Sequence, residues 1–188
     1  MTAVTLIIIA GLIIAGVVLV SHFAPAKSKL MVAQEGSHFP TVSGYNLNRQ
    51  EYEFPRDFSG DLNLVMVAFQ QRQQFTINTW IPFAQEVEAK YPNFFYYELP
   101  TIYEMPALSR TFINEGMRAG IPDRTARERT ITFYLDKDSF RSALDIPGEE
   151  DIHLFLVDRE GKILWRTTGA YSESKASELI QAIEAHSQ

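Results

Sequence analysis

The chain of 188 residues contains no cysteine. This absence excludes a disulfide framework, a thiolate nucleophile and a zinc site built on thiolates. It leaves the cellular compartment open, because domains without disulfides occur on either side of a membrane.

The sequence also lacks a basic excess, since 17 lysines and arginines stand against 23 acidic residues and give a net charge of −6. A general nucleic-acid-binding protein needs a positive footprint to neutralise phosphates, so we expect no nucleic-acid partner. Hydrophobic residues make up 46% and charged residues 21% of the chain, which is typical of a globular protein. The length fits one domain with an appendage.

Sequence motifs of common catalytic and metal sites are missing as well. The chain has no G-x-S-x-G, P-loop or G-x-G-x-x-G motif. The histidines are scattered at positions 22, 38, 153 and 186, so we expect neither a metal site nor a cofactor. His153 lies in an apolar segment and is expected to be a core or edge residue. The acidic run Glu149–Asp151 precedes a strand, which favours a solvated turn over an acid–base pair.

The longest uncharged segment is at the N-terminus, where residues 3–20 are almost entirely apolar and the first charge is Lys27. At about 1.5 Å per residue, a helix of this length crosses a hydrocarbon core of about 30 Å. The segment is apolar on every face, which argues against a buried core helix. We therefore predict a single-pass membrane anchor over residues 1–26. A cleavable signal peptide is the alternative, since Ala24-Pro25-Ala26 resembles a cleavage site, although no lysine or arginine precedes the run.

The charges after this segment favour one orientation. Lys27 and Lys29 follow the predicted span, and the positive-inside rule then places the domain on the cytoplasmic side, or the matrix side in a mitochondrion. A periplasmic domain stays open as the other orientation. Residues 27–49 mix Pro, Ser, Gly and Lys without sustained periodicity, which predicts a linker before a folded domain over residues 50–188.

Hydrophobic patterning then predicts alternating strands and helices. The predicted strands are Asn63–Phe69, Phe94–Leu99, Thr130–Leu135 and a hairpin of Ile152–Val157 with Lys162–Arg166, whose turn uses Gly161 at positive φ. Four helices are predicted. The first has an apolar face of Ile77, Trp80, Ile81, Ala84, Val87 and Tyr91, and the second begins at Pro106 and has an apolar face of Leu108, Phe112 and Ile113. A short helix is predicted over Ser139–Leu144, and the last helix is capped by Ser172 and has an apolar face of Ala176, Leu179, Ile180 and Ile183. Pro82 is expected in the first turn of its helix or at a kink. This order predicts an α/β fold with a mixed sheet and helices on both faces.

Two segments resemble the thioredoxin-like redoxin superfamily. Phe54–Gly60, followed by the buried run Asn63–Phe69, resembles the unit that leads into the redoxin active-site loop. The hairpin Leu154–Ile163 resembles the late strand pair of the same superfamily. The resemblance covers roughly residues 50–186 and implies a thioredoxin-like fold.

Within that superfamily, the chain is most similar to the mitochondrial ATP synthase assembly factors with a thioredoxin-like fold. The matching pieces are Trp80–Phe83, Met117–Pro122, Phe155–Asp158, Gly161–Arg166 and Gly169. The resemblance implies a protein that helps to assemble a membrane complex by binding, without chemical turnover.

The chain departs from active redoxins where these carry a Cys-x-x-Cys motif or a peroxidatic cysteine. Gln70-Gln71-Arg72-Gln73-Gln74 stands there instead, and an amide is no substitute for a thiolate nucleophile. Pro147, the nearest counterpart of the cis-proline that faces the dithiol in thioredoxins, lies several residues too early. We therefore expect a protein that is not a thiol redox enzyme.

The residues at this position, one tryptophan after it and a later group of arginines are the candidates for binding a protein partner. They are the five residues Gln70, Gln71, Arg72, Gln73 and Gln74, together with Trp80 and the four arginines of one polar stretch, Arg118, Arg124, Arg127 and Arg129. Amides and guanidinium groups suit the recognition of backbone and polar side chains, and the arginines suit lipid headgroups or an acidic surface. A solvated loop and a solvated connection without secondary structure are the alternatives, and for Trp80 the alternative is a core or edge aromatic residue. The sequence thus favours a membrane-anchored assembly factor or chaperone, with an enzyme of unrecognised type or a structural subunit of a membrane complex as the other hypotheses.

Overall fold

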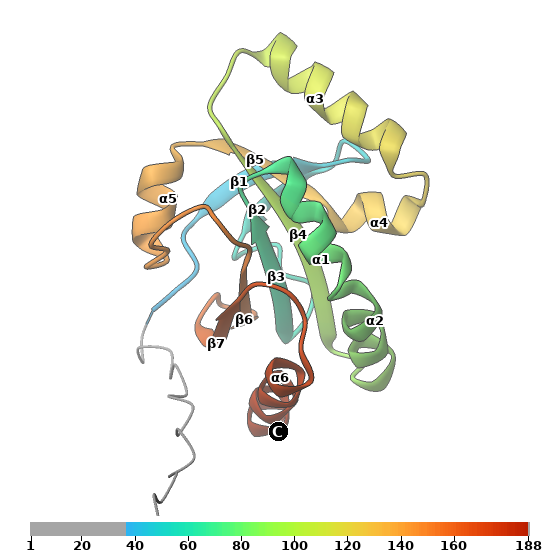
Figure 1. The fold of residues 1–188 in the computed structure, drawn as a ribbon, viewed down its shortest axis with the longest axis vertical. Coiled ribbons are helices and arrows are strands. Elements are labelled where there is room, and N and C mark those ends of the chain that lie inside the picture. Colours follow the sequence, from blue (N-terminus) through green and yellow to red (C-terminus); the bar gives the residue numbers. More distant parts are fainter. Residues whose placement is uncertain (1–36, 188) are drawn as a thin grey trace, which may run out of the picture. The chain divides into compact units, whose positions relative to one another are not determined.

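The computed structural model describes residues 37–187, which form one folded domain (Figure 1). The predicted anchor over residues 3–20 and the two lysines after it lie outside the described residues. Within residues 37–187, every helix is too short or too polar to cross a membrane.

The centre of the domain is a seven-stranded mixed sheet with the order β2-β1-β5-β4-β3-β6-β7. Its strands are β1 Val42–Asn46, β2 Glu51–Phe54, β3 Leu62–Ala68, β4 Phe94–Tyr103, β5 Ile131–Leu135, β6 His153–Asp158 and β7 Ile163–Thr168. Strands β3, β4 and β5 are parallel, whereas β6 pairs antiparallel with both β3 and β7. Every residue of β3 is buried, as the continuous apolar run predicts for a central strand covered on both faces.

Helices cover both faces of the sheet, and each face has its own core. The helices are α1 Gln74–Asn78, α2 Ile81–Lys90, α3 Ala107–Gly120, α4 Arg124–Arg129, α5 Lys137–Ala143 and α6 Glu173–His186, with a 3₁₀ turn, η1, at Gln71–Gln73. Ile77 of α1, Val87 of α2 and Leu179 of α6 share one core with alternate β3 residues. Phe140 of α5 belongs to the core of the other face, which is rich in phenylalanine. The predicted α/β architecture is therefore confirmed.

Local signals explain several boundaries. Pro82 is in the first turn of α2, and its missing N–H is one reason why the expected single helix is divided into α1 and α2. Ser172 caps α6 by accepting a hydrogen bond from the Lys175 amide. Gly161 has a φ of +90°, and a Cβ there would lie 2.7 Å from a carbon of Pro55, so this turn requires glycine.

The domain begins earlier than the sequence predicts. Strand β1 lies in the segment expected to be a linker, and it pairs with both β2 and β5. Phe39 is also buried in the phenylalanine-rich core. The segment escaped detection because Val42–Asn46 contains serine, glycine and asparagine, and so lacks the apolar alternation that indicates a strand.

Candidate functional site

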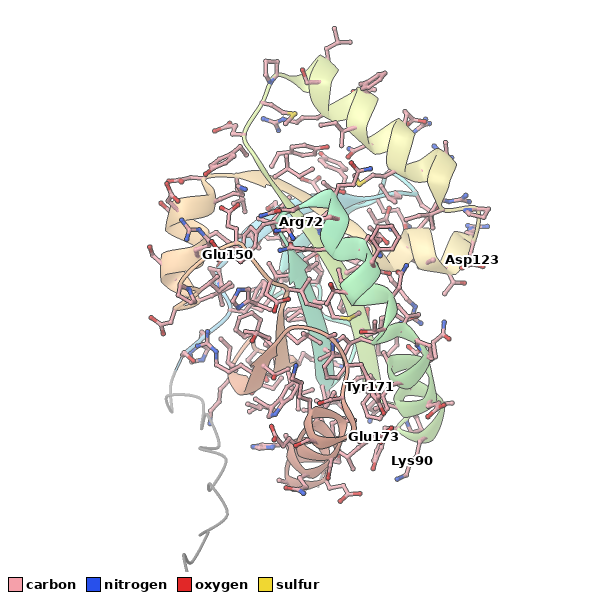
Figure 2. All side chains as sticks on the ribbon, viewed as in Figure 1. Arg72, Lys90, Asp123, Glu150, Tyr171 and Glu173 are labelled. Carbon is pink, nitrogen blue, oxygen red and sulfur yellow. The ribbon has the colours of Figure 1, made fainter. Side chains whose placement is uncertain are left out.

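The five residues Gln70–Gln74 follow the carboxyl end of the central strand β3, and the last of them, Gln74, is the first residue of α1. This position was expected from the sequence, and Arg72 marks it in Figure 2. Gln70 and Gln73 bond to the segment before β6, and Gln74 bonds to Glu98 of β4. Gln71 and Arg72 are exposed.

Gln73 is 3% exposed and holds the loop together. Its side-chain oxygen accepts hydrogen bonds from the backbone N–H groups of Phe69 at 2.7 Å and Gln70 at 3.1 Å. Its side-chain amide donates to the Glu149 carbonyl at 2.7 Å, and the amide of Gln70 donates to the same carbonyl at 2.9 Å. The loop is thus fastened to the segment before β6, which lies 76 residues further along the chain.

The side chain of Glu149 extends this connection to α5. Its carboxylate forms an ion pair with Lys137, whose side chain is only 6% exposed, and a longer one of 3.5 Å with Arg141. The Lys137 ammonium also lies 4.1 Å from the centre of the Tyr103 ring. The solvated turn expected for Glu149 is therefore wrong for this residue, because its partners are 12 and 8 positions away and leave no local pattern.

We call the exposed side chains Gln71 and Arg72 of the loop and Phe75 of α1, together with Tyr103 at the end of the neighbouring strand β4, the loop edge. The Phe75 side chain is 79% exposed and that of Tyr103 53% exposed. Arg72 donates to the Gln70 side chain at 2.7 Å, which orients its guanidinium group beside the loop. Phe75 is not among the residues predicted from the sequence. Its position off the apolar face of Ile77 and Trp80 is the signal that could have identified it.

A buried carboxyl group lies behind the loop edge. Glu98 of β4 is 7% exposed, and its carboxylate accepts a hydrogen bond of 2.8 Å from Gln74. Burial raises the pKa of Glu98, and the hydrogen bond from Gln74 opposes that effect. His153 of β6 is also buried, and burial lowers its pKa. Its ring lies near the Gly148 carbonyl and the Phe69 ring, as expected for a core or edge residue.

Trp80 is a core residue, which is the alternative that the sequence offered to a contact with a partner. The side chain is fully buried, and its indole N–H donates to the Gly169 carbonyl at 2.9 Å. It packs against Phe83 and Tyr171 in the core shared by α1, α2 and α6. Trp80 therefore connects the start of α2 to the loop before α6.

The four arginines do not act together. Arg129 pairs with Glu88 at 2.8 Å and stacks over Tyr96, and Arg127 donates to Asn48 and to two backbone carbonyls. Arg124 is exposed and Arg118 is half-buried. The connection expected to lack secondary structure contains α4, whose N-cap Asp123 accepts from the Ala126 amide.

Within residues 37–187, no group of three or more His, Asp or Glu side chains is arranged to hold a metal ion. Phe54–Pro55 is the one cis peptide bond among these residues, so the Pro147 bond is trans. The loop edge instead combines exposed aromatic rings with amide and guanidinium donors on a hydrogen-bonded loop, an arrangement suited to binding.

Comparison with known proteins identifies the fold. A candidate electron transfer protein from Aquifex aeolicus VF5 aligns with a TM-score of 0.55 at 9% identity over 80% of this chain and 97% of its own. A candidate thiol:disulfide interchange protein DsbE from Chlorobium tepidum aligns with a TM-score of 0.50 at 18% identity over 81% and 96%. BsSco, of the Sco family of cytochrome c oxidase assembly proteins, aligns with a TM-score of 0.51 at 10% identity over 80% and 94%. No family model and no curated protein sequence matches the chain.

The chain therefore has a thioredoxin-like fold, as the resemblance of its sequence to redoxins predicts. Identities this low show the fold alone. Within that class the chain is a cysteine-free member, in which a glutamine-rich loop follows the first buried strand of the parallel unit.

Proposed function

We propose that this chain is a membrane-anchored binding protein that assists the assembly of a membrane complex through the loop edge, without thiol redox chemistry. The observation that carries the proposal is the Gln73 network. It occupies the position after β3 with hydrogen bonds to the Phe69 and Gln70 amides and the Glu149 carbonyl. The chain contains no thiol that could perform electron transfer there.

The exposed side chains of the loop edge support binding over turnover. Aromatic and arginine side chains dominate the energetics of many protein interfaces. Phe75 and Tyr103 offer apolar rings, and Arg72 and Gln71 offer donors that suit the backbone carbonyls of a partner segment. Because the loop is already ordered by Gln73, binding costs little conformational entropy.

The predicted anchor supports the choice of partner. Tethering raises the effective concentration of the loop edge near membrane subunits, so a weak contact suffices. The resemblance to ATP synthase assembly factors makes subunits of that complex the first partners to test. BsSco supports the general idea only by analogy, because it shares the fold and belongs to a family of assembly proteins for another membrane complex.

Site-specific crosslinking in intact membranes tests the proposal. Because the chain has no cysteine, Gln71→Cys gives a unique site for a photoreactive label, and Ser177→Cys on the exposed side of α6 gives the matched control. We expect newly made membrane subunits to be crosslinked from position 71 and not from position 177. Arg72→Glu combined with Gln71→Ala should abolish capture by the full chain. Equal capture by that variant, or equal adducts from both labelled positions, would refute the loop edge as the contact.

A further inference from the structure

Lys137 is a buried cation at the carboxyl ends of the parallel strands. Its side chain is 6% exposed, although lysine is almost never fully buried unless it is paired. The residue follows β5 by two positions, and β5 pairs with β4 through Leu135 and Tyr103. Ligands of open α/β sheets bind at this edge of the sheet, so a buried charge here is a candidate for a role in binding.

Two aromatic rings lie against the ammonium group. The Nζ atom of Lys137 is 4.1 Å from the centre of the Tyr103 ring and 5.6 Å from the centre of the Phe69 ring. A cation within about 6 Å of a ring centre is attracted to the face of the ring, and more strongly where water is excluded. Phe69 is 8% exposed, whereas Tyr103 is 53% exposed. The buried ammonium therefore contacts a loop-edge ring that is otherwise open to solvent.

The same ammonium connects Tyr103 to the loop Gln70–Gln74. Lys137 forms an ion pair with the Glu149 carboxylate, and the Glu149 carbonyl accepts two hydrogen bonds from side-chain amides of the loop. Arg141 is a second cation for the Glu149 carboxylate, at 3.5 Å. Because Arg141 can keep Glu149 in place, we expect the charge of Lys137 to act mainly on Tyr103.

The contact matters for binding because Tyr103 is an exposed side chain. A side chain that changes rotamer freely loses entropy when a partner immobilises it. A ring that a buried cation already holds loses less. The cation thus extends to Tyr103 the preorganisation that Gln73 gives to the loop.

We propose that Lys137 is a positioning residue for the loop edge, whose ammonium holds the Tyr103 ring ready for a partner while its ion pair with Glu149 connects the ring to the loop. The inference rests on the proposed function, since it gives Lys137 a part in partner binding. The competing explanation is an ion pair that stabilises the fold alone, in which case removal of the charge lowers Tm without a specific effect on Tyr103.

Fluorine NMR of the full chain in detergent, with 3-fluorotyrosine placed at position 103, tests the contact. Lys137→Met removes the charge and keeps an unbranched side chain, and it should shift the fluorine resonance. Lys137→Arg keeps a cation and should return the resonance towards its wild-type position. Lys90→Met is the matched control, because Lys90 is exposed and lies 5.0 Å from the ring of Tyr91 at the end of α2. An unchanged resonance in Lys137→Met would overturn the inference.

A second NMR measurement leaves Lys137 in place and so does not depend on the folding of a variant at that position. The ε-methylene protons of Lys137 should resonate upfield of those of Lys90, because they lie by the ring of Tyr103 in a buried contact. Tyr103→Ala should move them back downfield. Protons that Tyr103→Ala leaves unchanged would show that the ring and the ammonium are not in contact, which would overturn the inference as well.

Partner capture in intact membranes then tests the role in binding. With the photoreactive label at position 71, Lys137→Met should lower the yield of crosslinked membrane subunits by roughly threefold to tenfold, as expected from ordering one side chain on binding. Lys137→Arg should keep most of the yield, and Lys90→Met all of it. In a Tyr103→Ala chain, Lys137→Met should lower capture no further, since its effect passes through the missing ring.

The outcomes separate the inference from the proposed function. Full and additive losses from Lys137→Met and Tyr103→Ala would mean that Lys137 acts through stability, and this would overturn its role as a positioning residue. Capture that Lys137→Met leaves unchanged would overturn the inference alone. Absence of capture by the wild-type chain would overturn the proposed function, and the inference with it.

Discussion

Replacing Gln73 by alanine tests whether the glutamine loop is a fixed structure. The substitution removes three hydrogen bonds, two from the backbone N–H groups of Phe69 and Gln70 and one to the Glu149 carbonyl. At a net value of about 1 kcal/mol for each bond, we expect Gln73→Ala to lower the free energy of unfolding by about 3 kcal/mol. Since about 1 kcal/mol shifts the midpoint by roughly 2–4 °C in a domain of this size, Tm should fall by roughly 6–12 °C.

Urea unfolding of the full chain in detergent, followed by tryptophan fluorescence, measures this change. Both tryptophans are buried in the fold, so their emission reports the unfolding of the core. Gln71→Ala is the matched control, because Gln71 lies on the exposed side of the same turn. Gln73→Met separates the loss of hydrogen bonds from the loss of volume, and it should cost nearly as much as alanine. A loss below about 1 kcal/mol for Gln73→Ala, or one no larger than for Gln71→Ala, would refute the proposed network.

Three further predictions concern buried polar groups of the same domain. Glu149→Gln leaves the nearly buried Lys137 ammonium without its carboxylate and should cost about 2–3 kcal/mol, whereas adding Lys137→Met should recover part of that loss in urea unfolding. Burial raises the pKa of Glu98 in the fold. The protonated carboxyl group therefore contributes fully to the free energy of unfolding below the unfolded pKa of about 4.3, and this contribution is lost as the pH rises through the folded pKa. The difference in free energy of unfolding between Glu98→Gln and wild type should therefore favour the variant more at pH 7 than at pH 4. An equal difference at both pH values would contradict the effect of burial on the pKa of Glu98. Trp80→Phe removes the indole hydrogen bond to Gly169 but keeps an aromatic ring, so it should cost about 1–2 kcal/mol in thermal unfolding, and an unchanged Tm would exclude that bond as a stabilising contact.

The sequence predicts the elements whose signal is local. The buried run around Val65 can only be a central strand, and the Ser172 cap and the apolar face after it define α6. The sequence does not predict the β1–β2 hairpin, because both strands are short and β1 contains serine, glycine and asparagine. Helix α4 was missed for a similar reason. It has only six residues and no apolar face, and it forms because Asp123 caps it and Arg129 reaches Glu88.

The candidate site was predictable in position and not in detail. The order of elements places Gln70–Gln74 after the central strand, and the structure has them there. Which glutamine turns inward depends on the Glu149 carbonyl, a partner so distant in sequence that no local pattern encodes it. The same limit explains Trp80, whose indole partner Gly169 lies 89 residues away. A large aromatic side chain in an amphipathic helix is equally compatible with a core and an interface.

The glutamine loop has a consequence for how a thioredoxin-like domain can function without thiols. A loop after β3 has backbone groups that need partners once it is buried, and a glutamine side chain provides an acceptor and a donor together. Gln73 uses the acceptor for its own loop and the donor for the loop before β6, so one residue fixes two segments. A loop fixed in this way presents Gln71, Arg72 and Phe75 in a constant arrangement, which favours recognition because little entropy is lost on binding. The rigidity of the inner glutamines and the exposure of the outer residues therefore both support the proposal that the loop edge binds a partner by shape and hydrogen bonding.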